Sequence, residues 1–181
     1  SVGSLVFSRE EEVPWTNPYA DVTEDLWSYQ YITELNKAGI LPDAAAFQPE
    51  AEATRGELIV ALFNMDSIVF AEQKKERERA QKGQALAPSF YDVSPDSELY
   101  EPVAWAYRNG IVSGTTSTTF SPNDSLTREQ VCTLIARFGA LEGVQLARVV
   151  EPDQFKDSIY VSEYARSGVT ACQMAGIIKG Y

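Results

Sequence analysis

The sequence has no histidine in 181 residues and only two cysteines, Cys132 and Cys172. Without histidine, neither a Ser-His nor a Cys-His nucleophile pair can form. Two cysteines are too few for the usual structural zinc site. Cys132 lies in an apolar run with helical spacing, so we predict two buried free thiols in preference to a disulfide. We predict no metal and no cofactor.

Positive charge and long apolar runs are also scarce. Lys and Arg total 15 against 26 Asp and Glu, a net charge of −11, which argues against general binding to nucleic acid. The longest apolar run, residues 58–63, has six residues, far below a membrane span, so no membrane insertion is expected. Hydrophobic residues make up 44%, enough for a packed core. Residues 1–16 lack the apolar core of a signal peptide and are interpreted as a lead-in.

The main organising feature is an internal repeat. Gly39-Ile40 aligns with Gly110-Ile111, and an Asp-Val pair stands eighteen residues before each glycine. A Phe-x-Pro triplet follows, and a Thr-Arg pair comes seven residues after its phenylalanine. In the two copies these elements are Asp21-Val22 and Asp92-Val93, Phe47-Gln48-Pro49 and Phe120-Ser121-Pro122, and Thr54-Arg55 and Thr127-Arg128. This self-similarity predicts a tandem array of one supersecondary unit.

A third copy begins at Phe155-Lys156-Asp157 and reaches Ala175-Gly176-Ile177. Its Phe-x-Pro and Thr-Arg segments are expected in the residues that follow in the parent chain. We therefore divide the sequence into the lead-in (1–16), a first repeat with a charged extension at about 70–83 (17–88), a second repeat (89–145) and a partial third repeat (153–181).

Each repeat is predicted to be a helix, a loop and a second helix. Gly39 is a natural left-handed end for the first helix. The second helices begin with capping boxes, in which Thr54 pairs with Glu57 and Thr127 with Gln130. In the second helix of the second repeat, apolar residues at helical spacing indicate one core face, namely Val131, Leu134, Ile135 and Phe138.

Arg55 and Arg128 have no part in these capping boxes. Both stand at the first helical position, where the positive end of the helix dipole disfavours a cation. A repeated arginine there suggests an anionic ligand, which would meet the guanidinium and the free backbone amides. The alternative is an ion pair with a nearby acid such as Glu52 or Asp124.

Residues 72–79 are rich in both charges, with four positive and three negative side chains. Lys74 and Glu78, and Glu78 and Lys82, stand at i,i+4 spacing. This pattern predicts a solvated extension of the second helix of the first repeat, ending near Gly83. A basic interaction arm is the alternative interpretation.

The order Asp-Val, apolar stripe, Gly-Ile, Phe-x-Pro and Thr-Arg-x-Glu/Gln resembles the S-layer homology repeat of bacterial surface proteins. Residues 102–138 resemble it best, and the resemblance covers most of 17–181. It implies an all-α pseudo-threefold bundle of helix-loop-helix repeats, with the third truncated. It further implies non-covalent anchoring to the cell wall, through inter-repeat grooves that bind a secondary cell-wall polysaccharide carrying a pyruvate ketal. The expected location is extracellular, at the cell wall or S-layer.

The resemblance carries over to particular residues. Arg55 and Arg128 match the arginine of the family motif, Trp27 its helix-one tryptophan, and Asp21, Asp92 and Asp157 its early aspartate. Gly56 and Glu129 replace its alanine. A carboxylate suits arginine, and a sugar ring suits an aromatic face, with core packing as the alternative for each aromatic residue. The predicted glycan-binding residues are Arg55, Arg128, Trp27, Trp105, Asp21, Asp92 and Tyr107.

Two other functions remain open at this point. The repeats could form a protein-interaction or S-layer lattice scaffold that binds no glycan, with contacts to an S-layer or another surface protein. An enzyme could use carboxylate pairs such as Asp21 with Asp25 or Asp92 with Asp96. These pairs are typical of turns and helix starts, so we predict that the chain is not an enzyme.

Overall fold

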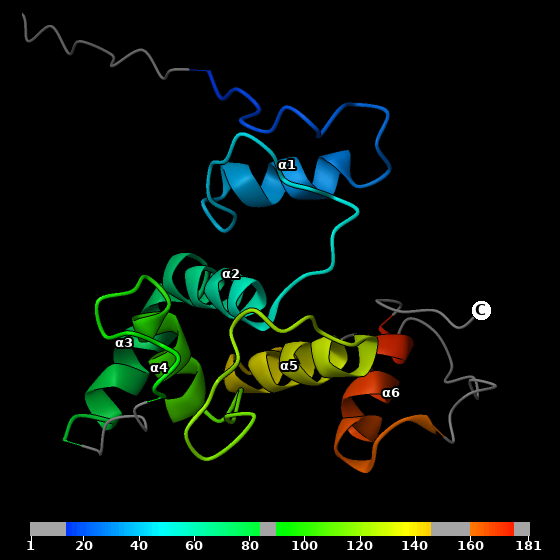
Figure 1. Cartoon of the computed structure of the whole chain (residues 1–181). Helices are drawn as coiled ribbons and strands as arrows, with labels where there is room; N and C mark the ends of the chain where they lie inside the picture. Colours follow the sequence, from blue (N-terminus) through cyan, green and yellow to red (C-terminus); the bar gives the residue numbers. More distant parts are fainter. Residues whose placement is uncertain (1–13, 84–89, 146–159, 176–181) are drawn as a thin grey trace, which may run out of the picture. The chain divides into compact units, whose positions relative to one another are not determined.

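The computed structural model describes residues 14–83, 90–145 and 160–175, and the regular elements in these ranges are helices. In chain order they are α1 (Tyr29–Lys37), α2 (Arg55–Ile68), α3 (Ala71–Ala80), α4 (Tyr100–Arg108), α5 (Arg128–Leu141), the 3-10 helix η2 (Glu163–Ala165) and α6 (Arg166–Met174) (Figure 1). The all-α prediction is confirmed. None of these helices combines the length and the apolar character that crossing a bilayer requires.

The chain forms two compact units, Ser1–Pro49 and Glu50–Tyr181. The boundary falls inside the predicted first repeat (17–88), so the two helices of that repeat belong to different units. The pseudo-threefold arrangement of whole repeats therefore stays a prediction. Asp157 and the Gly176-Ile177 pair of the third repeat lie outside the described residues.

The first unit is built around α1 and the loops on either side of it. Its apolar core consists of Tyr19, Val22 and Ile32, with Leu26, Tyr29, Leu41 and Phe47 packed against them. Asn36 is a buried polar residue that accepts a hydrogen bond from Trp15 Nε1 at 2.9 Å and donates to the Leu41 carbonyl at 3.0 Å. Gly39 ends the helix with a φ of 77°, as predicted.

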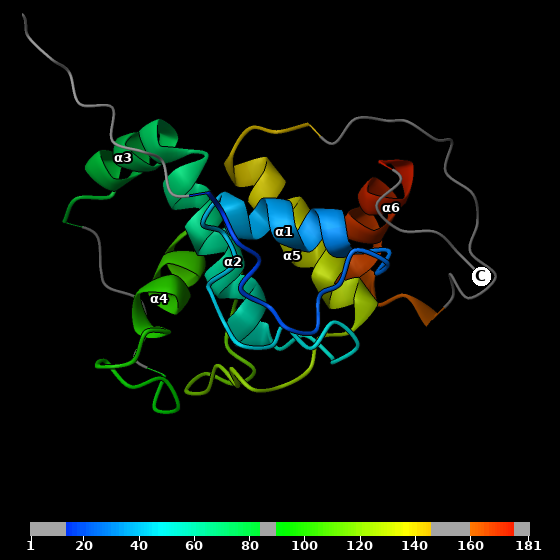
Figure 2. The ribbon, with the colours of Figure 1, turned by 90° about the horizontal axis from the view of Figure 1, so that it is seen from above.

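The second unit has its main core between α2, α4 and α5. α2 lies beside α4 (Figure 2), and the buried core residues include Ile59, Val103, Leu134 and the ring of Phe120. Trp105 lies in this core as well, in edge-to-face contact with Phe63 and Phe138 at centroid distances of 5.6 and 6.2 Å. The phenylalanine of the second Phe-x-Pro triplet thus points into the core.

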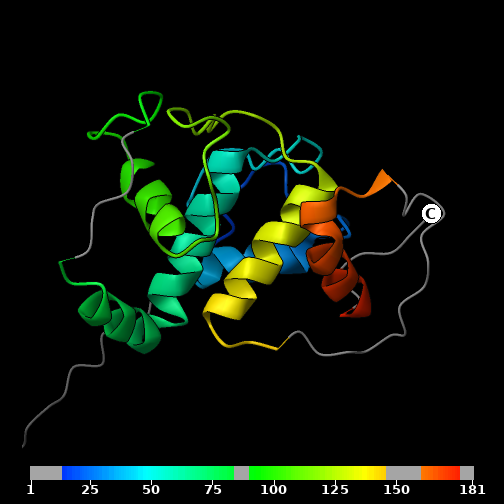
Figure 3. The ribbon, with the colours of Figure 1, turned by 90° about the horizontal axis from the view of Figure 1, so that it is seen from below.

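A second buried surface of α5 faces α6 (Figure 3). This smaller core contains Cys132, Ala165, Val169 and Cys172. Both cysteines are free and buried, as predicted. The two helices approach closely at Gly168, where an added Cβ would lie 3.0 Å from the Cα of Thr133 and 3.1 Å from the carbonyl oxygen of Cys132.

The charged segment does not continue α2, and the predicted extension is wrong in this respect. The chain leaves the α-helical conformation at Phe70 (φ −112°, ψ 31°), and α3 is a separate helix. Its charges are not all solvated, because Arg77 bonds to the buried carboxylate of Asp66 and donates from Nη1 to Glu142 Oε2 at 3.0 Å. Lys74 donates to Ser67 Oγ at 2.7 Å. Lys74 Nζ also lies 4.0 Å from Asp66 Oδ2, so buried acids on α2 and after α5 hold two cations of α3 inward.

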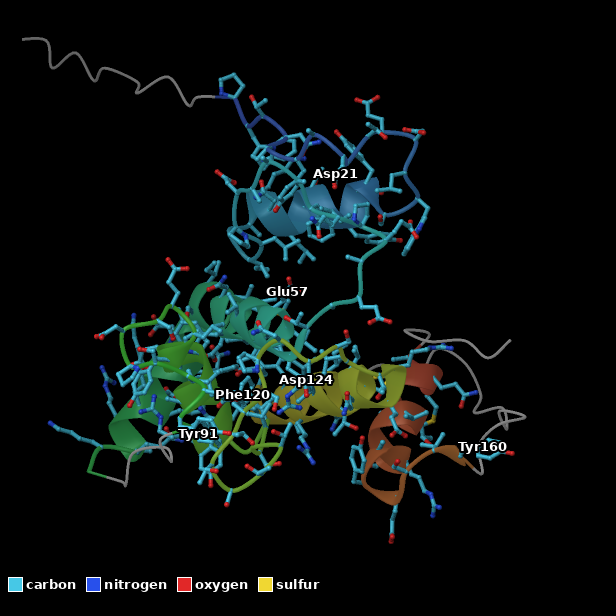
Figure 4. All side chains as sticks on the ribbon, viewed as in Figure 1. Asp21, Glu57, Tyr91, Phe120, Asp124 and Tyr160 are labelled. Atoms are coloured by element: carbon cyan, nitrogen blue, oxygen red, sulfur yellow. The ribbon has the colours of Figure 1, made fainter. Side chains whose placement is uncertain are left out.

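Each Phe-x-Pro loop is held by the aspartate at the start of its repeat. Asp92 accepts hydrogen bonds from the backbone N–H groups of Phe120 and Ser121, at 2.9 and 2.7 Å. Asp21, in the loop before α1 (Figure 4), accepts in the same way from Phe47 and the following residue, at 2.8 and 2.7 Å. The middle residue of both triplets has a φ of 59°, in the left-handed region. The repeated aspartate therefore fixes an unusual loop conformation.

We expect Gly168→Ala to destabilise the second unit by about 1–3 kcal/mol, because the methyl group would force α5 and α6 apart. The measurement is urea denaturation followed by circular dichroism. Gly139→Ala on α5 is the matched control, since its Cβ would meet only an ordinary contact of 3.4 Å. The free energy of unfolding of that variant should rise by up to about 1 kcal/mol, because alanine has a higher helix propensity than glycine. Equal effects of the two changes would contradict the close packing at Gly168.

We expect Asp92→Asn to lower the free energy of unfolding by about 1–2 kcal/mol at pH 7. The side-chain amide has one oxygen that can accept a hydrogen bond, whereas the carboxylate has two. Burial alone would raise the pKa of Asp92, but the N–H groups of Phe120 and Ser121 outweigh it and the pKa is lowered. A carboxylate with a lowered folded-state pKa stabilises the fold above its unfolded pKa of about 4, and this stability is lost as the pH falls further.

The free energy of unfolding of the wild type should therefore decline more steeply below about pH 4 than that of Asp92→Asn. Urea titrations at a series of pH values measure this difference. Asp96→Asn removes an exposed aspartate from the same segment and should change neither quantity. Identical acid profiles for the wild type and Asp92→Asn would rule out the loop-holding function of Asp92.

Candidate functional site

The candidate site is built on the first turn of α2. Both capping boxes are confirmed. Thr54 Oγ1 accepts from the Glu57 N–H at 3.2 Å, and Glu57 Oε2 accepts from the Thr54 N–H at 2.9 Å. Thr127 and Gln130 form the same pair at the start of α5, at 3.3 and 2.9 Å. The capping boxes therefore do not involve the guanidinium groups of the two first-turn arginines.

The loop that connects α4 to α5 lies against this first turn. The backbone N–H of Arg55 donates to the Asp124 carbonyl at 3.0 Å, and that of Gly56 donates to the Pro122 carbonyl at 2.8 Å. Phe120 and Asp124 belong to this loop (Figure 4). The expectation of free amides at the start of α2 is therefore wrong, because two of them are satisfied by the loop.

The same contact accounts for a glycine at position 56. A Cβ there would lie 3.1 Å from the Pro122 carbonyl oxygen and 3.4 Å from a side-chain carbon of Leu99. The loop therefore comes closer to the helix here than the methyl group of an alanine would comfortably allow.

Arg55 is fixed by backbone carbonyl groups. Its Nε donates to the Phe120 carbonyl at 3.0 Å, and its Nη2 donates to the Ser113 carbonyl at 3.1 Å. Its Cζ lies 4.8 Å from the centroid of the Phe120 ring. These neutral partners replace the ion pair with Glu52 or Asp124 that was considered as an alternative. Burial lowers the pKa of Arg55, and the charges of Asp124 and Asp92 oppose this effect.

Arg55 thus has a fixed, half-buried guanidinium with unused hydrogen-bonding capacity. Nε and one N–H of Nη2 are occupied, and Nη1 has no hydrogen-bond acceptor among the described residues. A planar cation held in this way can accept a carboxylate from solvent.

The start of α5 differs from that of α2. Glu129 accepts from the backbone N–H and the hydroxyl of Ser162, at 2.9 and 2.8 Å, and from the hydroxyl of Tyr164 at 3.2 Å. The two bonds from Ser162 lower the pKa of Glu129. Arg128 is exposed at the first position of the helix. The acid in the alanine position of the motif therefore connects the second repeat to the third.

The predicted aromatic residues differ widely in exposure. Trp27 is 82% exposed in the first unit, and Tyr107 is partly exposed and packs edge-to-face against Phe90. Trp105 is only 4% exposed. The prediction that Trp105 binds a sugar ring is therefore wrong, because neither face of a ring enclosed in the core can contact a ligand.

The structure brings together some of the predicted residues and adds others. Asp92 and Arg55 act on the N–H and the C=O of the same residue, Phe120. Tyr164 lies within electrostatic range of Arg55 and of Arg137 on α5. Its burial and the charge of Glu129 raise the pKa of Tyr164, and the two arginines oppose this increase. Tyr164, Ser113 and Glu129 were missed because only contacts distant in sequence reveal them. Asp21 and Trp27 belong to the other unit. No group of metal-ligating side chains occurs in the described ranges.

Comparison with known proteins identifies the repeats. The S-layer homology domain matches residues 18–59 and 89–132. An endoglucanase of Bacillus sp. (strain KSM-635) is 26% identical over 168 residues, covering 90% of this chain and 16% of the relative. The surface-layer 125 kDa protein of Lysinibacillus sphaericus is 32% identical over 92 residues, covering 51% of this chain and 7% of the relative. An amylopullulanase of Thermoanaerobacterium thermosulfurigenes is 22% identical over 176 residues, covering 96% of this chain and 9% of the relative.

The chain thus spans less than a fifth of each of these relatives. S-layer homology domains are non-catalytic modules that generally anchor the proteins carrying them to the cell wall. The two matched stretches contain both aspartate-held loops and both Thr-Arg helix starts. Through these repeats the chain belongs to the S-layer homology domain family.

Proposed function

We propose that this chain anchors its parent protein to the bacterial cell wall by binding a secondary cell-wall polysaccharide that carries pyruvate ketals. Its location is then outside the cell, at the wall or S-layer. The observation that carries this proposal is the guanidinium of Arg55, which two carbonyl groups hold over the Phe120 ring while Nη1 has no acceptor in the described part of the chain.

The chemistry of the site suits a sugar that carries a carboxylate. A pyruvate ketal presents a carboxylate, which a guanidinium can bind with two parallel hydrogen bonds. Tyr164, 53% exposed and within electrostatic range of Arg55, offers an aromatic face for a sugar ring. Arg137 adds a second positive charge in the same region. Arg55, Arg137 and Tyr164 are therefore our proposed ligand groups in the second unit.

The net charge of −11 works against an anionic ligand at long range. Binding therefore depends on short-range contacts with Arg55, whose hydrogen-bond partners are uncharged carbonyl groups. Since screening weakens such charge-assisted contacts only in part, affinity should fall with salt but persist at physiological ionic strength.

We expect Arg55→Ala to weaken glycan binding more than tenfold, or about 1.5–3 kcal/mol, because a charge-assisted hydrogen bond is lost. Arg55→Lys should rescue binding only in part, since an ammonium lacks the planar fork. Calorimetric titration of pyruvylated, wall-derived oligosaccharide measures both effects, with melting curves recorded alongside. Arg79→Ala, which removes one exposed charge from α3, is the control and should bind like the wild type.

Unchanged affinity in Arg55→Ala would refute the proposed ligand role, as would a melting loss large enough to account for the weaker binding. A pull-down on purified sacculi, with and without their polysaccharide, separates the glycan anchor from a scaffold that binds other proteins. Retention on both preparations would favour the scaffold.

A further inference from the structure

Two carboxyl groups are fully buried where α2, α3 and the end of α5 meet. Asp66 lies on α2, and Glu142 directly follows α5. The charged side chains that face them in the described part of the chain are Arg77 and Lys74, both from α3. A buried carboxylate needs hydrogen-bond donors on both of its oxygens, because no water replaces them.

The donors at this junction do not reach all four carboxyl oxygens. Arg77 donates from Nη2 to Asp66 Oδ1 and from Nη1 to Glu142 Oε2, the second at 3.0 Å. Lys74 donates to Ser67 Oγ at 2.7 Å, and its Nζ lies 4.0 Å from Asp66 Oδ2, beyond hydrogen-bonding distance. The remaining oxygens, Asp66 Oδ2 and Glu142 Oε1, have no hydrogen-bond partner among the described residues.

The two unpaired oxygens belong to neighbouring groups. Arg77 Nη2, which donates to Asp66, also lies 3.0 Å from Glu142 Oε1, although that contact lacks the geometry of a hydrogen bond. The two carboxyl groups are themselves close enough to hydrogen-bond to each other. If both were ionised, two like charges and two bare acceptors would face each other away from water. One proton between them removes both problems.

We propose that Asp66 and Glu142 share one proton in the folded protein, which makes the junction of α2, α3 and the end of α5 sensitive to pH. Glu142 is the protonated partner and donates to Asp66, which keeps its charge and its bond to Arg77. The proposal does not involve Arg55, so it and the proposed glycan contact can fail independently.

The direction of the pH dependence follows from the uptake of this proton on folding. Burial raises the pKa of Glu142; the bond from Arg77 opposes this and the contact with Asp66 adds to it, so that the pKa stays above its ordinary value of 4.5. The contribution of the pair to stability is therefore complete below about pH 4.5 and is lost as the pH rises through the folded-state pKa. Asp92 has the opposite dependence, since its contribution is lost on acidification.

A direct test is the titration of the Glu142 carboxyl group. Its side-chain ¹³C signal is followed against pH in the full labelled chain, once in the folded protein and once in urea. We expect the midpoint to be higher in the folded protein. A folded midpoint equal to or below the unfolded one would overturn the proposal, because both acids would then be ionised, with water in place of the proton.

Glu142→Gln provides the second test, because its amide can donate to Asp66 as the protonated acid does but cannot titrate. The midpoint of urea denaturation is measured for the wild type and the variant from about pH 8 to about pH 4.5. We expect the midpoint of the wild type to rise relative to that of the variant as the pH is lowered. Groups that titrate in both proteins cancel from this difference.

Glu76→Gln removes an exposed glutamate from α3 and is the matched control, so its profile should run parallel to that of the wild type. A Glu142→Gln profile that also ran parallel to the wild type would overturn the proposal. Should Glu142→Gln fail to fold, the carboxyl titration of the wild type decides alone.

Discussion

Phe120 is held from both sides of its backbone and by its ring. Asp92 binds its N–H, Arg55 binds its C=O, and the ring is fully buried between α2, α4 and α5. The loop of the second repeat is thereby fixed to the first turn of α2, the second helix of the first repeat. Arg55 could not be held where it is if this loop moved, so the candidate site depends on the anchoring of one residue.

The repeat pattern was sufficient to predict the helices, the caps and the free cysteines, because these depend on local spacing and side-chain type. The aspartate contacts follow the same spacing. Asp21 bonds 26 residues ahead and Asp92 28, and the two-residue difference is the insertion between Gly-Ile and Phe. The repeat contains this contact, but a sequence alone does not distinguish a carboxylate that binds a loop from one that binds a ligand.

The predictions that failed concern contacts between segments far apart in sequence. Helical spacing predicted a solvated charged extension, but Asp66 and Glu142 lie 11 and 65 residues from Arg77 and are buried. Trp27 and Trp105 were both predicted to bind a sugar ring, although one is 82% and the other 4% exposed. The amides at the start of α2 seemed free because the loop that binds them comes from the next repeat. In each case the partner follows from tertiary packing.

The nature of an arginine's partners determines what it can still bind. Arg77 is held by two carboxylates, which fix its position and also cancel its charge. Arg55 is held by two carbonyl groups, and Arg137 donates to the Ile111 carbonyl at 3.0 Å. A carbonyl dipole orients a guanidinium without neutralising it. In an acidic protein this difference is what keeps a positive charge available to an anion, so the arginines bound to backbone oxygen are the ones suited to a ligand.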